Sequence, residues 1–213
     1  MDLSREIALI ERISADIKDR QDMVAFMNHS VIVSRLAGRV ARELGEPEEF
    51  CREMEIAGML HDIGKLRIAA YIYGPQSESM HVSRIKHVRM HPSLGNDLLR
   101  GEGGYSEKLI SYIACHHENY DGTGYPNHLE GEDIPYGARI LRVCDLFAAL
   151  VSNRKYRAAF SVDAAIEMMI DEVKNFDMRI FLAFLSVVHA DDFGTIEGYI
   201  AKARSYGINR RQI

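Results

Sequence analysis

The stretch "ARILRVCDLFAALVS" (residues 138–152) is an apolar segment with one carboxylate near its middle. Its apolar residues run on without strand-like alternation, which predicts a buried helix. Asp145 interrupts this run, and a buried carboxylate is costly unless it pairs with a cation or binds a metal. The residues alone leave two alternatives open, an ion pair with Arg139 or Arg142 and a metal site.

Helical periodicity extends outward from this segment over most of the chain. Leu3, Ile7, Ile10 and Ile17 fall on one face of an N-terminal helix, which either packs on its own domain or serves in dimerisation or signalling. Strand-like alternation is convincing nowhere, so the chain is predicted to be all-α. Further helices are expected at about 21–43, 48–60, 106–118, 138–152, 161–174, 178–189 and 194–205.

Local signals set some boundaries of these helices. Ser106 and Ser161 are the expected N-caps of two of them. The segment 82–101 is expected to form helical pieces broken near Pro92. The segments 73–79 and 119–137 are predicted loops, because glycine and proline punctuate them.

Composition limits the class of protein. With 213 residues, the chain is long enough for one domain with a short appendage, and 47% apolar residues argue against disorder. A net charge of −5 does not favour a nucleic-acid partner. Cys51, Cys115 and Cys144 form no CxxC pair, which favours a reducing cytoplasm. The charged N-terminus is not a signal peptide, and no apolar run is long enough to span a membrane.

Two adjacent pairs of metal-ligating residues stand out, His61-Asp62 and His116-His117. Neighbouring residues on a helix point about 100° apart, so one member of a pair can serve one metal while the other serves a second or bridges both. Asp62, with two carboxylate oxygens, is the natural bridge.

The wider set of candidate ligands also includes the single residues His29, His91 and Asp145. Five histidines and two aspartates favour transition metals over magnesium. A two-metal site suits phosphate ester hydrolysis, because it generates a hydroxide, neutralises the phosphate and holds the attack in line. Lys65 follows Asp62 by three residues and is expected to steady a phosphate or a leaving oxygen; the alternative is a solvated lysine.

Several strings together resemble the HD-GYP domain, the helical branch of the HD superfamily that is similar to cyclic di-GMP phosphodiesterases. They are "HDIGK" (61–65), "HPSLG" (91–95), "HHENYDGTGYP" (116–126), "IPYGARILRVCD" (134–145) and "SNRKYR" (152–157). The resemblance covers roughly residues 22–188. It implies a helical bundle with the metal site in its core.

The resemblance also implies a site. Two divalent transition metal ions are expected, iron or manganese first and nickel or zinc as alternatives. One ion takes His29, His61, Asp62 and Asp145, and the other shares Asp62 and takes His91, His116 and His117. Lys65, Arg154 and Arg157 match positions that hold the substrate, with Asp62 and Lys65 as the catalytic residues. The implied reaction is hydrolysis of cyclic di-GMP to linear pGpG, to GMP, or to both.

The loop that follows the paired histidines belongs to the same resemblance. Its residues are Asp121, Gly122, Gly124, Tyr125 and Pro126. In the family this loop is linked to substrate and to partner contacts, and the resemblance implies a diguanylate cyclase with a GGDEF domain, or another signalling protein, as a partner. A homodimer is also left open.

Three departures from the family pattern keep other functions in view. Ala25 stands where some members have a glutamate that helps bind a third metal, so two metals are expected. Ala148 replaces a second acidic residue, and the segment 66–82 is atypical. The alternatives are an HD phosphohydrolase for another cyclic dinucleotide or nucleotide, and a degenerate module that binds cyclic di-GMP and signals. The expected organisation is an N-terminal helix (1–20), a catalytic domain (21–190) and a helical tail (191–213).

Overall fold

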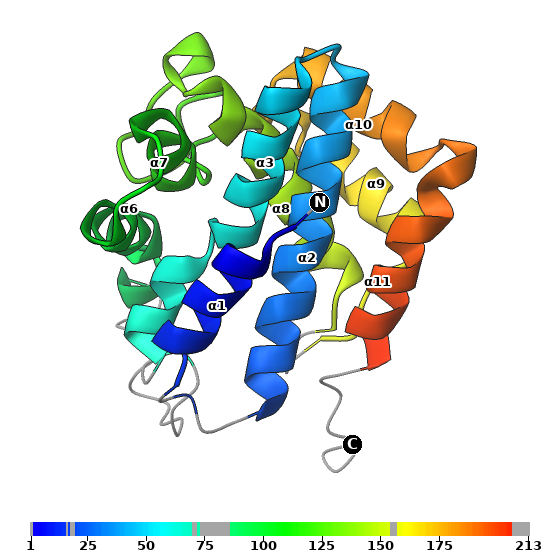
Figure 1. Ribbon diagram of the computed structural model, residues 1–213. Coiled ribbons are helices and arrows are strands. Elements are labelled where there is room, and N and C mark those ends of the chain that lie inside the picture. The colour runs from blue at the N-terminus through cyan, green and yellow to red at the C-terminus, as the bar shows by residue number, and fades with distance from the viewer. Residues whose placement is uncertain are drawn as a thin grey trace.

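The computed structural model describes residues 2–15, 17, 20–69, 72, 86–153 and 157–205, and the elements named among them are all helices, which confirms the all-α prediction (Figure 1). The α-helices are α1 (Ser4–Ile13), α2 (Arg20–Glu43), α3 (Glu48–Leu60), α6 (His91–Glu102), α7 (Glu107–Ala114), α8 (Tyr136–Val151), α9 (Val162–Asp171), α10 (Met178–Val188) and α11 (Gly194–Ser205). Short 3-10 helices are η1 (Ile63–Ile68), η3 (Gly131–Asp133), η4 (Val173–Asn175) and η5 (Asp191–Phe193).

Helix α2 is the centre of the bundle. It packs against α3, α8, α10 and α11, and Figure 1 shows it running between α3 and α11. Its residues Ile32, Val33 and Leu36 are fully buried. A helix surrounded on several sides can present a polar residue to the interior, and α2 does so with His29.

The first and last helices share this core. Leu9 and Ile10 of α1 and Ile196 and Ile200 of α11 belong to the same hydrophobic cluster as α2 and α8. Helix α1 thus packs on its own domain, one of the two alternatives that its sequence left open, and it ends at Ile13. Among the described helices, none combines the length and apolar character that a bilayer crossing requires.

One predicted helix end is wrong, and one predicted break is confirmed. Helix α7 ends at Ala114, before the paired histidines, where the sequence predicted a helix to 118. The predicted break near Pro92 is confirmed among the described residues: residues 86–88 are helical, residues 89–90 form a turn, and α6 begins at His91 with Pro92 in its first turn. A proline is tolerated there because the first N–H groups of a helix have no partner within it.

The two predicted N-caps are confirmed. Ser106 Oγ accepts a hydrogen bond from Leu109 N at 3.0 Å, and Ser161 Oγ accepts one from Ala164 N at 3.2 Å. Each bond satisfies a backbone donor that the first turn of a helix leaves unpaired.

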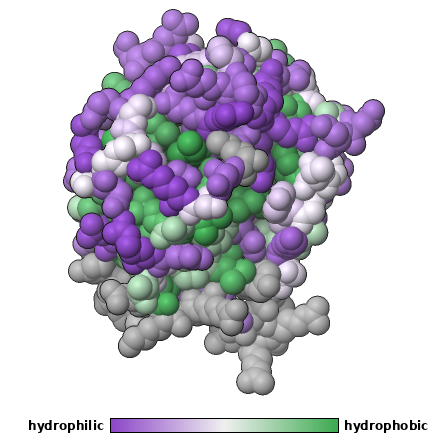
Figure 2. Space-filling model, viewed as in Figure 1, coloured by the Kyte–Doolittle hydropathy of each residue, from purple (hydrophilic) through white to green (hydrophobic). Residues whose placement is uncertain are grey.

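Hydrophilic residues gather over the upper part of the face drawn in Figure 2, around the turn between α2 and α3. Arg42 lies at that turn, and its guanidinium pairs with Glu48 at 2.7 Å and with Glu55 at 2.9 Å. The charged side chains at that end of the bundle therefore satisfy one another near the surface. The ionisable groups described next lie inside the bundle.

Candidate metal centre

The junction between α3 and η1 carries the first candidate pair. His61 is the C-cap of α3, and Asp62 precedes η1. Gly64 lets this junction approach α6 closely, since a Cβ on Gly64 would lie 2.0 Å from the carbonyl oxygen of His91. The glycine of "HDIGK" therefore brings the first pair next to the N-terminus of α6, where His91 begins the helix.

Three of the histidines are oriented in the same way. His61 Nδ1 lies 2.7 Å from Gly58 O, and the same nitrogen of His91 and of His116 lies 2.6 Å from the carbonyl oxygen three residues earlier. A carbonyl oxygen only accepts, so each Nδ1 donates and the neutral ring keeps its lone pair on Nε2. Such outer hydrogen bonds are typical of metal-ligating histidines.

The Nε2 atoms face one another in pairs. His91 Nε2 lies 3.2 Å from His116 Nε2, and His29 Nε2 lies 3.2 Å from His61 Nε2. Between two neutral rings the lone pairs repel at this distance unless a proton or a metal ion lies between them. Two donors bound at about 2.1 Å to one ion, at right or tetrahedral angles, lie about 3.0–3.4 Å apart, so the spacing fits shared ligation of a metal ion.

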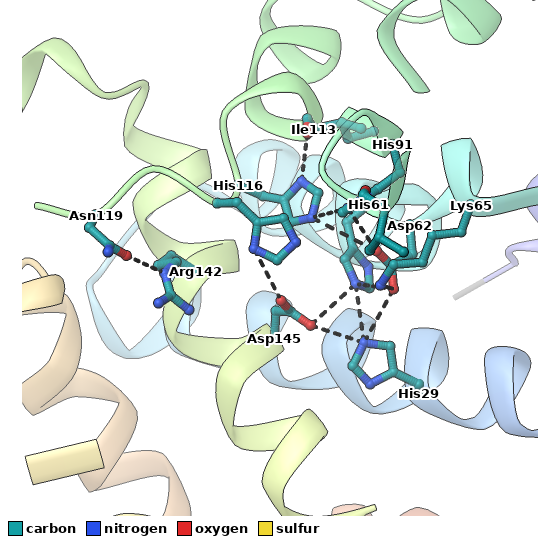
Figure 3. A network of polar contacts seen from close by, with 12 residues as sticks. His29, His61, Asp62, Lys65, His91, Ile113, His116, Asn119, Arg142 and Asp145 are labelled. Atoms are coloured by element: carbon teal, nitrogen blue, oxygen red, sulfur yellow. Dashed lines mark hydrogen bonds and ion pairs between the residues drawn. The ribbon is translucent and has the colours of Figure 1, made fainter. Parts of the chain in front are cut away.

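Asp62 lies between the two pairs (Figure 3). Its Oδ2 is 3.4 Å from His61 Nε2 and 3.6 Å from His29 Nε2, while its Oδ1 is 3.2 Å from His91 Nε2 and 3.9 Å from His116 Nε2. Oδ1 is buried and accepts no hydrogen bond among the described residues. Asp62 Oδ1 is thus free to bind a metal ion together with His91 and His116, while Oδ2 faces the other histidine pair, as expected of a carboxylate that bridges two ions.

Asp145 closes the arrangement from α8. Its Oδ1 lies 3.0 Å from His29 Nε2 and 3.6 Å from His61 Nε2, and its Oδ2 lies 3.9 Å from His117 Nδ1. Neither Arg139 nor Arg142 pairs with it, so the structure decides between the alternatives that the sequence left open at this residue. The carboxylate in the apolar helix faces histidines.

All seven candidate ligands are thus brought together. Three overlapping groups have their donor atoms within 4.8 Å of one another: Asp62, His91, His116 and His117; His29, His61 and Asp62; and His61, His116 and Asp145. Imidazole nitrogens and carboxylate oxygens form a donor set that suits divalent transition metals. The residues present therefore fit divalent metal binding.

Burial and charge keep most of these groups in the state that metals bind. Burial acts to raise the pKa of Asp62 and of Asp145, but neighbouring cationic groups outweigh it and hold both well below their usual range. Burial lowers the pKa of His117 to about 3 and also depresses that of His116. At neutral pH both carboxylates are ionised and these two imidazoles are neutral, as ligation requires.

His61 differs from the other histidines. Burial acts to lower its pKa, but Asp62 and Asp145 outweigh burial and raise the pKa to about 10. In the metal-free domain a proton on His61 thus offsets part of the charge of the two carboxylates. A metal ion bound there would displace this proton.

Lys65 is paired and only partly solvated. Its Nζ lies 2.5 Å from Asp62 Oδ2, and only 20% of its side chain is exposed. Lys65 lies in η1, a 3-10 helix, in which residues three apart eclipse each other, and this explains the contact.

The loop after His117 forms one wall of the site. The ring of Tyr125 stacks on His117 with centroids 4.8 Å apart, and its backbone N donates to His117 O at 3.1 Å. The guanidinium of Arg89 lies 5.2 Å from the centroid of the Tyr125 ring. Gly124 permits the tight turn, because a Cβ there would lie 2.2 Å from Asn119 N.

Two carboxylates hold this loop. Asp121 Oδ1 accepts from Thr123 N at 3.1 Å. Glu118 is buried and accepts from Asn127 N at 2.6 Å and from Leu129 N at 3.2 Å. No local pattern marks Glu118 as the residue that fixes the loop backbone.

A sequence profile of the HD domain family matches residues 14–180. This chain belongs to the HD domain family. The family that its motifs suggested is thereby confirmed, and the fold of this HD domain agrees with the helical bundle that the family predicts.

Curated relatives of the HD domain are cyclic-dinucleotide phosphodiesterases by name. The cyclic di-GMP phosphodiesterase response regulator RpfG of Xanthomonas campestris is 41% identical over 140 residues, covering 63% of this chain and 35% of that protein. The 3'3'-cGAMP-specific phosphodiesterase 1 of Vibrio cholerae is 31% identical over 181 residues, covering 83% of this chain and 41% of that protein. The chain spans less than half the length of these relatives.

Solved structures show the same fold. An HDG"Y"P protein from Bdellovibrio bacteriovorus aligns with a TM-score of 0.63 at 20% identity, covering 84% of this chain and 57% of that one. The HD domain of the phosphodiesterase PgpH from L. monocytogenes, in complex with cyclic-di-AMP, aligns with a TM-score of 0.52 at 17% identity, covering 85% of this chain and 90% of that one.

Of the two arginines expected to bind substrate, Arg157 lies within the described residues and Arg154 does not. Arg157 donates to the carbonyl oxygens of Ala149, Leu150 and Ala158 at 2.8–3.2 Å, so its guanidinium caps the C-terminal end of α8. Arg154 lies outside the described residues, as does most of the atypical segment 66–82.

The two alanines that depart from the family pattern lie in different environments. Ala25 is exposed on α2, one turn before His29. Ala148 is fully buried in the hydrophobic core, where a carboxylate would be costly without a partner.

Proposed function

We propose that this HD domain is a metal-dependent phosphodiesterase that hydrolyses cyclic di-GMP to pGpG, to GMP, or to both. The names of its relatives, the donor set and the depth of the site support this assignment. The proposed cofactors are two divalent transition metal ions per chain, iron or manganese first. The proposed location is the cytoplasm, where the three free and buried cysteines would remain reduced.

The arrangement around Asp62 is the observation that carries the proposal. Its two oxygens face different histidine pairs, His29 with His61 and His91 with His116, so one carboxylate would bridge two ions. His117 and Asp145 complete the two sets, as the family resemblance implies. When bound, the two ions supply Lewis acidity toward a phosphoryl group and activate water for in-line attack.

The chain's own residues orient these groups. The carbonyl bonds to His61, His91 and His116 fix which ring nitrogen faces the site. Lys65 lies next to Asp62 and would turn toward a substrate phosphate once metal ions neutralise that carboxylate. Tyr125 covers the ring of His117 and limits the access of water on that side.

The loop of residues 119–130 is also the proposed contact for a partner protein. Thr123, Asn127 and His128 are exposed along it. A diguanylate cyclase with a GGDEF domain is the partner that the family resemblance suggests, and it stays a proposal together with a homodimer.

Metal quantification and product chromatography on one sample test the function. Anaerobically purified protein loaded with iron or manganese should hold two ions per chain and convert cyclic di-GMP to pGpG or GMP. Intact cyclic di-GMP at full metal occupancy would refute the proposal. Fewer than one ion per chain would instead favour a degenerate module that binds and signals.

A second substrate, 3'3'-cGAMP, is favoured by one observation. A relative specific for that dinucleotide by name aligns over 83% of this chain, whereas RpfG aligns over 63%. Parallel assays with both cyclic dinucleotides at equal concentration would decide, and a tenfold preference for 3'3'-cGAMP would replace cyclic di-GMP as the substrate.

A further inference from the structure

Arg142 is a partly buried cation beside the candidate metal centre. It lies on α8 one turn before Asp145, and residues three apart on a helix share a face, with Cβ atoms about 5–6 Å apart. Its Nε donates to Asn119 Oδ1 at 2.8 Å, and Figure 3 shows the two residues next to the histidine–aspartate cluster. Its guanidinium also lies 5.7 Å from the centroid of the Phe176 ring.

No carboxylate in the described part of the chain lies within ion-pair distance of Arg142. Asp145, its nearest acidic neighbour on the helix, faces the histidines instead. Arg139, one turn earlier on the same helix, offers a contrast, because its Nη1 pairs with Asp177 at 2.7 Å. A partly buried cation without an ion-pair partner loses part of its hydration without full compensation, so Arg142 is poised to receive an anion.

The surroundings of Arg142 place that anion at the edge of the site. Asn119 follows His117 by two residues, and Tyr125 stacks on His117. Arg142 is close enough to Tyr125 to affect the pKa of its hydroxyl, although burial, which raises that pKa, is the larger influence. Arg142, Asn119 and Tyr125 thus form one side of the site.

The described cations that could contact a phosphate are few. The guanidinium of Arg157 is bonded to backbone carbonyls, and Lys65 is paired with Asp62. The exposed guanidinium of Arg89 lies against the ring of Tyr125. A cyclic dinucleotide carries two phosphodiester groups, and the metal cluster can receive only the one that is cleaved. The second phosphodiester keeps its negative charge and needs a donor outside the cluster.

We propose that Arg142 binds the second, uncleaved phosphodiester of the cyclic dinucleotide. This inference rests on the proposed function and adds to it a binding residue for the dinucleotide. A guanidinium suits the role, because its Nη groups can donate two parallel hydrogen bonds to one phosphate while Nε stays on Asn119. The alternative is that Arg142 only braces Asn119 in the turn after His117.

Paired substitutions on α8 separate these two roles. Arg142→Met removes the charge and keeps an unbranched stem against Phe176, Arg142→Lys keeps the charge without the fork, and Arg139→Met is the matched control. Binding is measured by calorimetry with a phosphorothioate cyclic di-GMP that resists hydrolysis. Hydrolysis is measured with cyclic di-GMP and with bis(p-nitrophenyl) phosphate, which has a single phosphodiester, and metal content is determined for every variant.

We expect Arg142→Met to weaken dinucleotide binding about 10- to 100-fold, with Arg142→Lys in between, as loss of a charge-assisted contact predicts. Hydrolysis of bis(p-nitrophenyl) phosphate and metal content should stay within twofold of wild type. Arg139→Met should bind the dinucleotide like wild type, even if it melts at a lower temperature.

Other outcomes overturn one proposal or the other. If Arg142→Met slows both substrates equally or loses metal, the residue braces the centre and the subsite is refuted. If cyclic di-GMP is cleaved and Arg142→Met binds it as tightly as wild type, the subsite fails and the reaction stands. If wild type binds the phosphorothioate through Arg142 but leaves cyclic di-GMP intact, the reaction fails and the subsite stands.

Discussion

Two turns of this HD domain place a histidine by the same backbone arrangement. His61 follows the last residue of α3, and His116 lies two residues after the end of α7. In each turn the ring Nδ1 donates to the carbonyl oxygen three residues earlier, that of Gly58 at 2.7 Å and that of Ile113 at 2.6 Å. Each Nε2 therefore faces the interior of the bundle.

The residue after each histidine makes the two turns electrostatic opposites. Asp62 follows His61 and, with Asp145, raises its pKa to about 10 against the effect of burial. His117 follows His116, where burial and the neighbouring imidazoles hold the pKa well below its usual value. The comparison teaches that the backbone sets where an imidazole points, while burial and the charged groups around the ring set its protonation state.

The largest expected effect comes from Asp62→Asn. This change removes the negative charge of the carboxylate whose oxygens face His61 in the first turn and His116 in the second. We expect phosphodiesterase activity to fall by more than the roughly 10- to 100-fold typical of outer-shell changes, together with loss of bound metal. Product chromatography and plasma mass spectrometry measure both. Asp171→Asn, an exposed carboxylate at the end of α9, is the control and should change neither quantity. Full activity in Asp62→Asn would remove Asp62 from the centre.

Gly64→Ala tests the packing that brings the first turn to α6. The added Cβ would lie 2.0 Å from His91 O, so backbone must move, and we expect unfolding to become easier by about 3 kcal/mol. Urea denaturation of the metal-free domain measures this. Gly198→Ala on α11 meets no atom within 4 Å and should be neutral or slightly stabilising. Equal stability of the two variants would contradict the close approach.

The opposite charges of the two turns predict proton release on metal binding. The pKa of His61 is about 10 in the folded, metal-free domain, above its ordinary value of 6.5. Its proton favours folding fully below about pH 6.5, and this contribution is lost as the pH rises through 10. At pH 8, metal binding should therefore release about one proton per chain from His61.

Titration calorimetry of metal binding in buffers of different ionisation enthalpy measures the number of protons released per chain. His117→Gln should leave the count unchanged, because burial lowers the pKa of His117 to about 3 and the ring carries no extra proton at pH 8. Metal binding without proton release would show that the carboxylates do not hold His61 protonated.

The smallest expected effect concerns the helix that leads into the second turn. Ser106 caps α7 with its side chain, whereas Pro47 at the start of α3 makes no side-chain cap bond. Ser106→Ala should lower stability by about 1 kcal/mol, or about 2–4 °C in Tm, without loss of metal. Differential scanning calorimetry measures the shift, and Ser161→Ala on α9 should match it. An unchanged Tm in Ser106→Ala, with a lowered Tm in Ser161→Ala, would mean that the cap of α7 does not contribute to the stability of the domain.

The sequence predicted the helices with unbroken apolar periods well. The ranges 48–60 and 194–205 agree with α3 and α11 at both ends. The early end of α7 was missed, because nothing local in "SYIACHHE" marks Ala114 as the last helical residue. That end reflects a tertiary requirement, since His116 and His117 must both reach the cluster.

The candidate site was predictable where a residue is out of place in its local context. Asp145 in an apolar helix indicated either a metal or an arginine partner, and the structure decides against the arginine. The bonds of Glu118 and of Arg157 were not predictable, because their partners are backbone groups positioned by the tertiary fold. The role of the seven residues as ligands stays a prediction that metal analysis will test.

The burial of Asp145 and Asp62 also connects the abundance of this protein in the cell to metal supply. Without an ion, the domain holds two ionised carboxylates in its interior, balanced in part by a proton on His61 and by the ammonium group of Lys65. An ion that binds only the native state adds about 4.1 kcal/mol of stability at a thousand times its Kd. We therefore expect metal-starved cells to degrade this protein faster than replete ones, so that its abundance follows metal availability.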